Sequence, residues 1–327
     1  MIEFWTATLA LTLGLYVVLD GFDLGVGILF GITRDEETKR FMLNSISPIW
    51  DGNETWLVLT ASILFGAFPI VYSLVLSAFY LPIIMLLAAL IFRGVAFEFR
   101  EKSGNNRWFW DAGFSVGSLV ASFVQGAAVG AIVEGIPNSD GRFTGTAFGW
   151  LTPFTILCGI GLCLGYSLLG AGWLVKKCDG AVRDRAYSII PGLLVGVMTF
   201  VAIAFVVSLV MELEVMNRWL DRPALAIFPV IGIGGCALII KGVRSRRDGW
   251  PFTGIVLLFL SAFGTLAASF LPYMIPFTIT IKEAAAPQSS LSFMFWGAGL
   301  FVMPITVIYT IVVYWLFKGK THSGGYH

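Results

Sequence analysis

Long apolar runs separated by short polar stretches make up most of the chain. A helix needs about 20 apolar residues to cross the hydrocarbon core of a membrane. Nine runs approach that length, at residues 4–32, 53–73, 76–99, 112–133, 148–175, 187–211, 224–241, 252–275 and 292–317. Composition points the same way, because 57% of the 327 residues are hydrophobic, 13% are charged and the mean hydropathy is +0.85. The pattern predicts an all-α polytopic membrane protein with nine transmembrane helices, and it excludes a soluble globular domain.

Positive charge is distributed unevenly over the predicted loops. Sixteen of the 21 Lys and Arg residues lie in the odd-numbered loops and in the tail after the ninth helix, against four in the even-numbered loops. Cytoplasmic loops carry the excess of Lys and Arg in membrane proteins. The bias therefore predicts an external N-terminus, a cytoplasmic C-terminus and an odd number of helices. No basic segment precedes the first apolar run, so we expect a retained helix there and not a cleaved signal peptide.

Carboxylates occur beside and within the apolar runs. Asp20 and Asp23 lie three residues apart on one face of the first predicted helix, and Asp51 and Glu54 stand at the start of the second. An ionisable side chain inside a membrane helix costs roughly 2.5–3.5 kcal/mol even on lenient scales, which favours a functional site. Two structural alternatives stay open. Asp23 could reach water from the helix end, and Asp51 with Glu54 could cap the first turn of the second helix.

Arg93 lies nearly two turns inside the third predicted helix. It either extends outward to water or pairs with a buried acid, and pairing is the interpretation we favour. Successive helices run in opposite directions, so Asp23, Asp51, Glu54 and Glu98 fall toward the same cytoplasmic side as Arg93. We therefore expect a polar cluster at the cytoplasmic end of a helical bundle, of a kind suited to moving protons.

Glycine and tryptophan add packing predictions. Gly14, Gly21 and Gly25 share one face of the first helix, where the backbone of a neighbouring helix could approach closely. Trp50 and Trp56 lie near a predicted membrane boundary, a position where tryptophan most often anchors a helix at the interface.

The histidines limit the cofactors that this chain could hold. Membrane redox subunits usually bind haem through His, or through His and Met. Only two histidines are present, His322 and His327, and both follow the ninth predicted helix. We therefore expect no bis-His haem, and the lack of a Cys/His cluster argues against a structural zinc ion. The four cysteines form no CxxC pair and are expected to be free thiols, and no phosphate-binding motif or nucleic-acid partner is expected.

Three segments closely resemble subunit II of cytochrome bd-type quinol oxidases. They are residues 19–27 (LDGFDLGVG), 44–56 (NSISPIWDGNETW) and 92–100 (FRGVAFEFR), and their spacing also matches that family. The second half of the chain is similar chiefly in helix count and length. The resemblance implies two four-helix bundles plus one peripheral helix in a prokaryotic cytoplasmic (inner) membrane. The first bundle with its polar motifs would span residues 1–134, the second residues 135–275, and the ninth helix with the cytoplasmic tail residues 276–327.

The same resemblance implies a function. The chain would be a haem-free subunit that assembles with a haem-bearing subunit I and with membrane lipid. The complex would oxidise quinol and reduce dioxygen to water with protons from the cytoplasm. Haem b and haem d type groups would lie in subunit I, and a small accessory transmembrane subunit and a structural quinone would be further partners.

The resemblance also implies candidate site residues, at the positions of this chain that match the motifs of that family. Asp51, Asp23 and Glu98 match acidic positions associated with a proton path, and Arg93 matches an embedded arginine. The remaining candidates are Asp20 and Glu54 for the proton path and Trp56 for contact with a quinone.

Two other hypotheses stay open from the residues alone. The acids could serve only as caps and ion pairs in a structural scaffold, in which case their substitution would lower the yield of the complex and leave turnover unchanged. The chain could instead be a proton-coupled secondary transporter, because embedded acids are also typical of that class. Nine helices argue weakly against a transporter fold made of two equal repeats.

Overall fold

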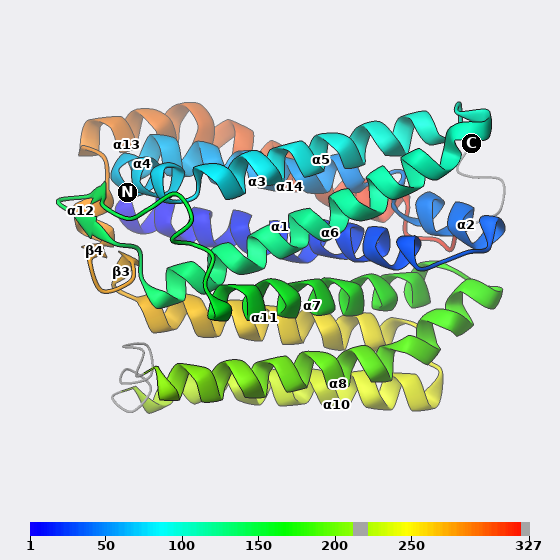
Figure 1. The fold of residues 1–327 in the computed structure, drawn as a ribbon. Helices are drawn as coiled ribbons and strands as arrows, with labels where there is room; N and C mark the ends of the chain where they lie inside the picture. The colour runs from blue at the N-terminus through cyan, green and yellow to red at the C-terminus, as the bar shows by residue number, and fades with distance from the viewer. Residues whose placement is uncertain (212–221, 322–327) are drawn as a thin grey trace.

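The computed structural model of the chain is a bundle of long helices that lie side by side (Figure 1). It describes residues 1–211 and 222–321. The segment 212–221 and both histidines, His322 and His327, lie outside the described residues.

Eight helical segments among the described residues are long and apolar enough to cross a membrane. In chain order they are α1 (Ile2–Gly31), α5 (Tyr80–Arg100), α6 (Arg107–Glu134), α7 (Pro153–Lys177), α8 (Gly180–Val210), η2 with α10 (Pro223–Ala226 and Ile227–Ser245), α11 (Gly249–Phe270), and a final rod. That rod consists of α13 (Gln288–Met294), the π-helical segment η3 (Phe295–Val302) and α14 (Met303–Leu316).

The shorter elements lie between the long helices. α2 (Glu36–Ile46) and η1 (Gly104–Asn106) follow α1 and α5, and α12 (Ile281–Ala284) precedes the final rod. Two small antiparallel hairpins complete the described structure. β1 (Asn138–Ser139) pairs with β2 (Arg142–Phe143), and β3 (Tyr273–Ile275) pairs with β4 (Ile279–Thr280).

Most of the predicted spans have shifted ends in the structure, as in the predicted helix 187–211, which begins at Gly180. Proline explains the differences in two other spans. The predicted helix 53–73 is divided into α3 (Trp50–Ala67) and α4 (Pro69–Ala78), and the predicted helix 252–275 ends at Phe270. Proline has no N–H to donate and disfavours helical geometry in the residue before it. Accordingly Phe68, before Pro69, has φ −135° and ψ 60°, and Leu271, before Pro272, has φ −54° and ψ 133°.

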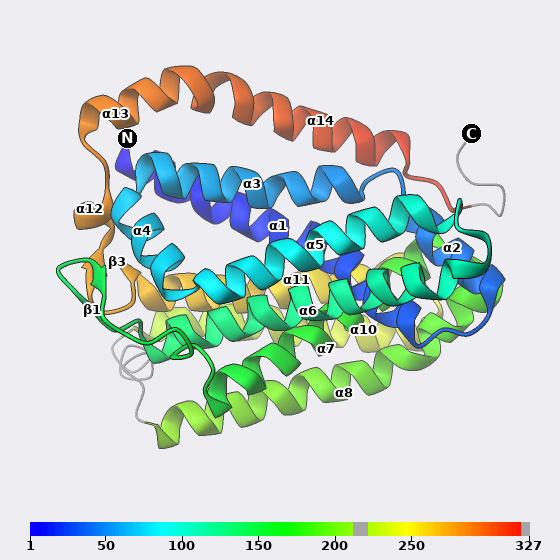
Figure 2. The same ribbon diagram turned by 45° about the horizontal axis from the view of Figure 1, so that its top comes forward.

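The helices form successive layers around α1 and α7. Figure 1 shows α8 and α10 on one side, α7 and α11 next to them, then α1 and α6, and finally α3, α5 and the α13–α14 rod. α1 packs against α3, α6, α7 and α11, whereas α14 lies along the outside next to α3 (Figure 2). α1 and α7 are the most buried of the long helices. The interior of the molecule therefore depends on the contact between these two helices.

Glycine makes that contact possible. A Cβ on Gly25 would lie 1.7 Å from the carbonyl oxygen of Tyr166, and one on Gly170 would lie 2.5 Å from the backbone of Gly25. At Gly21 the neighbour is a side chain and not the expected backbone, since a Cβ there would lie 2.7 Å from the Tyr166 ring. Gly14 meets only the side chain of Phe263. Backbones of α1 and α7 thus touch at Gly25 and Gly170, an arrangement that small residues permit in membrane helix pairs.

The loops that were predicted to be cytoplasmic lie together at one end of the molecule (Figure 1). We call it the basic end, defined by the α1–α2, α5–α6, α7–α8 and α10–α11 connections and the tail after Leu316. Buried Arg100 on α5 binds Asp111 on α6 (Nε–Oδ1 2.5 Å) and Glu36 on α2 (Nη2–Oε1 2.6 Å). Lys39 on α2 also reaches Asp111, at 2.6 Å. The charged segment after α1 is thus part of an ion-pair network as well as a solvated surface.

The tail after α14 is bound to the basic end of the other helices. Lys320 Nζ lies 2.6 Å from Asp248 Oδ2 and donates to the carbonyl oxygen of Cys178 at 2.9 Å. Lys177 donates to the carbonyl oxygens of Phe317 and Gly319. Burial acts to raise the pKa of Asp248, but hydrogen bonds from Lys320 and Tyr187 and the nearby charges outweigh it and leave this pKa below its usual value.

We predict that Gly25→Ala destabilises the protein, because the new methyl group would overlap the carbonyl oxygen of Tyr166. Overpacking in a tight interior typically costs about 1–3 kcal/mol. The thermal unfolding midpoint of the purified membrane complex should fall by several degrees. The matched control is Gly192→Ala on α8, where a Cβ meets nothing within 4 Å. Equal midpoints for the two variants would contradict the close crossing.

We also predict that Asp248→Asn lowers stability in a pH-dependent way. The pKa of Asp248 is lower in the native protein than in the unfolded chain, where it is about 3.9. The ionised carboxylate therefore contributes in full to the free energy of unfolding above about pH 3.9, and this contribution is lost as the pH falls through the lower native pKa. At pH 7 the free energy of unfolding of the wild type should exceed that of the variant by about 1 kcal/mol. This difference should shrink only in strong acid. Asp140→Asn, at an exposed hairpin position, is the control. A difference that disappears already near neutral pH would refute this assignment.

Candidate functional site

Asp20 on α1 and Arg93 on α5 form a buried ion pair in the interior of the molecule. Arg93 Nη1 lies 3.4 Å from Asp20 Oδ1, and the side chains are 1% and 0% exposed. α5 and α6 cross closely at Gly117, where a Cβ would lie 2.7 Å from the carbonyl oxygen of Ala89 and 3.3 Å from the Cβ of Arg93. This crossing holds the arginine in the interior, where its guanidinium carbon lies 5.8 Å from the ring centre of Trp50.

A hydrogen-bond chain joins Asp23 to the last helix. Asn53 on α3 donates from Nδ2 to Asp23 Oδ2 at 2.7 Å, and Tyr314 on α14 donates from its hydroxyl to Asn53 Oδ1 at 2.9 Å. Asp23 is fully buried and Asn53 is 1% exposed. The alternative in which Asp23 simply reaches water is therefore wrong for this structure.

Glu54 connects the buried acids with the surface. Its half-buried carboxyl interacts electrostatically with Asp20, with Arg93 and with Asp51. Asp51 and Glu54 are three residues apart on α3, a spacing that puts their side chains on neighbouring positions of the helix. The three acids therefore lie in order of increasing burial, from exposed Asp51 through Glu54 to Asp20.

The capping alternative for Asp51 and Glu54 is also wrong. α3 begins at Trp50, its N-cap residue is Ile49, and no side chain caps it. Asp51 is exposed, as is Glu98 on α5. Within the described part of the chain, no hydrogen bond or ion pair joins the carboxyl group of Glu98 to the buried cluster. The expected polar cluster thus has an interior part, with Asp20, Asp23 and Arg93, and an exterior part, with Asp51 and Glu98.

Several polar atoms of the cluster are buried without a hydrogen-bond partner in the described chain. They are Asp20 Oδ2, Asp23 Oδ1, the hydroxyl of Tyr16, and Nε and Nη2 of Arg93. Buried polar groups are hydrogen-bonded in the great majority of cases. The cluster therefore has donors and acceptors to spare, which is the chemical capacity that transfer of a proton between carboxyl groups requires.

Trp56 lies in the interior and not at the membrane boundary. Its side chain is 0% exposed and packs in a small apolar cluster with Tyr16 and Met303. The interpretation as an interfacial anchor is therefore wrong for Trp56, whereas Trp50 is half-buried against Phe97. Contact between Trp56 and a quinone stays a prediction.

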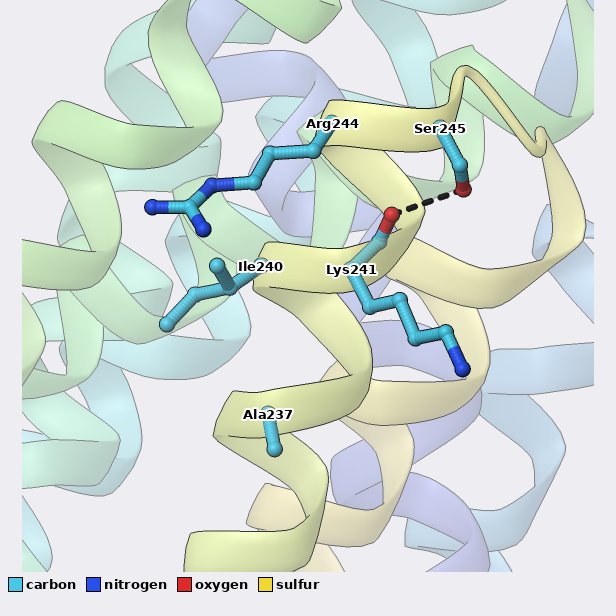
Figure 3. A pocket seen from close by; sticks show the side chains of 5 residues that line it. All are labelled: Ala237, Ile240, Lys241, Arg244 and Ser245. Atoms are coloured by element: carbon cyan, nitrogen blue, oxygen red, sulfur yellow. Dashed lines mark hydrogen bonds between the residues drawn. The ribbon is translucent and has the colours of Figure 1, made fainter.

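Two surface hollows lie away from the buried cluster. One, of about 490 Å³, lies between α1, α5, α6 and α7, and its lining is almost wholly apolar. The other, of about 520 Å³, lies on α10 and is lined by Ala237, Ile240, Lys241, Arg244 and Ser245. Figure 3 shows Lys241 and Arg244 pointing away from each other, so their charges do not converge on one ligand. Neither hollow includes Trp56 or any of the cluster acids.

Comparison with known proteins identifies the family. A family model described as cytochrome bd terminal oxidase subunit II matches residues 1–317. The chain belongs to this family.

Relatives extend over nearly the whole length. The chain is 32% identical to cytochrome bd-I ubiquinol oxidase subunit 2 of Escherichia coli, covering 97% of this chain and 93% of that one. It is 29% identical to cytochrome bd ubiquinol oxidase subunit 2 of Bacillus subtilis, covering 97% and 96%. The fold is similar to a chain in the structure of bd oxidase from Geobacillus thermodenitrificans, with a TM-score of 0.78, 17% identity and coverage of 97% and 98%.

Family membership places this subunit II in a terminal quinol oxidase complex of the respiratory chain. The apolar helices and the bacterial relatives fit a multi-pass protein of the inner membrane. The resemblance found in the first hundred residues is thus confirmed over the full chain.

Sequence reasoning found the acids but missed two of their partners. Asn53 lies inside the motif between Asp51 and Glu54, and an amide beside carboxylates could have been identified as a hydrogen-bond donor. Tyr314 gave no signal, because it lies 261 residues from Asn53 within an aromatic and apolar run. Only the packing of α14 against α3 and α7 brings it to the site.

We predict that Arg93→Met strongly destabilises subunit II, because it leaves the carboxylate of Asp20 buried without its cation. Removing one member of a buried pair typically costs about 3–5 kcal/mol. The double variant Arg93→Met with Asp20→Asn should recover part of the lost stability, since neither charge remains. Thermal midpoints and the yield of assembled complex measure both effects. Arg244→Met on the surface of α10 is the control, and equal losses in the single and double variants would contradict a stabilising pair.

Proposed function

We propose that this chain is the haem-free subunit of a quinol:dioxygen oxidoreductase and that it carries protons from the cytoplasm toward the oxygen-reducing site of a partner subunit. The observation that supports this most directly is the order of the acids. Asp51 is exposed, Glu54 is half-buried, and Asp20 and Asp23 are fully buried. A path for protons needs such a sequence of carboxyl groups from the surface to the interior.

The entrance lies at the basic end, which the positive-inside rule assigns to the cytoplasm. Asp51 is the surface carboxyl nearest to the cluster along α3, and Glu98 is a second exposed acid at the same end of α5. In the proposal these two acids collect protons from water, and Glu54 accepts them from Asp51. Glu98 contributes to the entrance without a direct bond to the interior.

The interior acids receive the proton from Glu54. Asp20 and Arg93 interact electrostatically with Glu54, and Asp20 with Asp23 in turn. Arg93 offsets the cost of burying negative charge in this part of the membrane. Asp23 Oδ1 has no hydrogen-bond partner in the described chain, so it can take up a proton without breaking a bond.

The residues of this chain also bear on where the haem groups of the complex lie. The membrane segments contain no histidine, so this chain does not fit a haem held by a pair of histidines. The described residues also contain no group of three His, Cys, Asp or Glu side chains able to hold a metal ion. In the proposal the haem b and haem d type groups, quinol oxidation and oxygen reduction therefore belong to subunit I. No step in this chain uses a haem.

The topology is part of the same proposal. Nine membrane crossings result if α3 crosses together with the eight long helical segments, and the N-terminus is then external. In the proposal α1, α3, α5 and α6 form the first bundle, α7, α8, α10 and α11 form the second, and the α13–α14 rod is peripheral. Family membership argues against the transporter hypothesis.

We predict that Asp23→Asn in the assembled complex lowers quinol-driven oxygen uptake at least tenfold, because an amide cannot pass on a proton. Asp51→Asn should lower it less, since Glu98 offers another surface acid. Oxygen consumption with excess quinol measures turnover, and the reduced-minus-oxidised haem spectrum measures the amount of intact complex.

The control is Glu37→Gln, an exposed acid on α2 at the same end of the molecule. Normal turnover per haem in Asp23→Asn would refute the proton path. A loss of assembled complex with normal turnover in what remains would support the scaffold hypothesis instead.

A further inference from the structure

Tyr314 connects the last helix with the acids of the first helices. Its hydroxyl donates to Asn53 Oδ1 at 2.9 Å, and Asn53 in turn donates to Asp23 Oδ2 at 2.7 Å. Helices α14, α3 and α1 each supply one member of this chain. The proton path proposed above runs through the acids alone and uses neither Tyr314 nor Asn53.

The chain has a direction that its acceptors set and that Tyr314 completes. An amide side chain can point either its oxygen or its nitrogen toward a neighbour. Asn53 Nδ2 faces two acceptors, Asp23 Oδ2 at 2.7 Å and the carbonyl oxygen of Leu19 at 3.3 Å, so Oδ1 is the atom that accepts from the Tyr314 hydroxyl. The reverse orientation would set the amide oxygen against the carboxylate. Asp23 Oδ2 thus accepts a hydrogen bond from Asn53, whereas Asp23 Oδ1 has no hydrogen-bond partner in the described chain.

Tyr314 is itself held by contacts with α7. Its ring lies edge-on to Trp173 of α7, with centroids 6.2 Å apart and planes at 71°. Three residues later the chain leaves α14 and is bound by Lys177, which follows Trp173 by four residues on α7. One turn of α7 therefore fixes both the ring of Tyr314 and the end of its helix.

We propose that Tyr314 is a positioning residue for proton transfer at Asp23, acting through the amide of Asn53. Its hydrogen bond to Asn53 Oδ1 holds the oriented amide in place, so that Asp23 Oδ2 stays occupied and Oδ1 is available to receive the proton. The proposal rests on the proton path given above and assigns to the peripheral rod a part in it. No bond is broken at Tyr314, whose proton stays on its oxygen.

The test begins with Tyr314→Phe in the full complex, which removes the hydroxyl and retains the ring. Turnover should fall about fivefold, the size expected from losing one hydrogen bond, with the KM for quinol unchanged. The H₂O/D₂O ratio of turnover should rise, because proton transfer then limits the rate. Tyr309→Phe is the matched control, since Tyr309 is on the same helix, lies against Gly52 of α3 and has no hydrogen bond at its hydroxyl within the described chain.

A double variant separates positioning from support of the fold. If Tyr314 acts through Asn53, adding Tyr314→Phe to Asn53→Ala should change turnover no further than Asn53→Ala does alone, because interacting residues are not additive. Multiplied losses would show that Tyr314 acts by another route and would overturn the proposal. Asn53→Ser gives the same comparison if Asn53→Ala does not assemble, as judged by the haem spectrum.

The outcomes also separate this proposal from the proton path. Loss of turnover in both Asp23→Asn and Tyr314→Phe, with Tyr309→Phe normal, supports it. Loss in Asp23→Asn with normal turnover and isotope ratio in Tyr314→Phe overturns the role of Tyr314 and leaves the proton path standing. Normal turnover in Asp23→Asn overturns both.

Discussion

The buried ion pair between Asp20 and Arg93 is the interaction on which the polar interior depends. Both side chains lie out of contact with solvent, and two charges in that environment are tolerated only if they compensate each other. Without Arg93, the neighbouring carboxyl groups of Asp23 and Glu54 would add negative charge to a region of low dielectric constant. The pair thus permits a group of acids to exist inside the membrane part of the protein.

Close helix crossings place the members of that group. α1 carries both aspartates, and its backbone touches α7 at Gly25 and Gly170. The crossing of α5 and α6 at Gly117 sets the depth of Arg93. A methyl group at these glycines would overlap a carbonyl oxygen or a neighbouring backbone, so the close crossings depend on glycine. The geometry of the acids is therefore a consequence of helix packing as much as of their own hydrogen bonds.

The last helix is attached to the rest of the molecule by few but specific contacts. Much of α14 is exposed, yet its end is held by Lys177, and Lys320 beyond it binds Asp248 and Cys178. These contacts join the end of the rod to α7 and to the start of α11, while Tyr314 reaches Asn53 on α3. The tail is therefore a structural link between the last helix and the second half of the chain.

The sequence by itself determined the class of protein, most helix positions, the side that carries positive charge and the identity of the acids. Those features follow from the length of apolar runs and from the high cost of polar groups in a membrane, which are local properties. Tertiary structure alone decided that Arg93 pairs with Asp20, that Asp51 and Glu98 stay outside while Asp23 is enclosed, and that Trp56 is interior. It also brought Tyr314 to Asn53, 261 residues away. Such partners depend on which helix faces touch, and no local pattern specifies that.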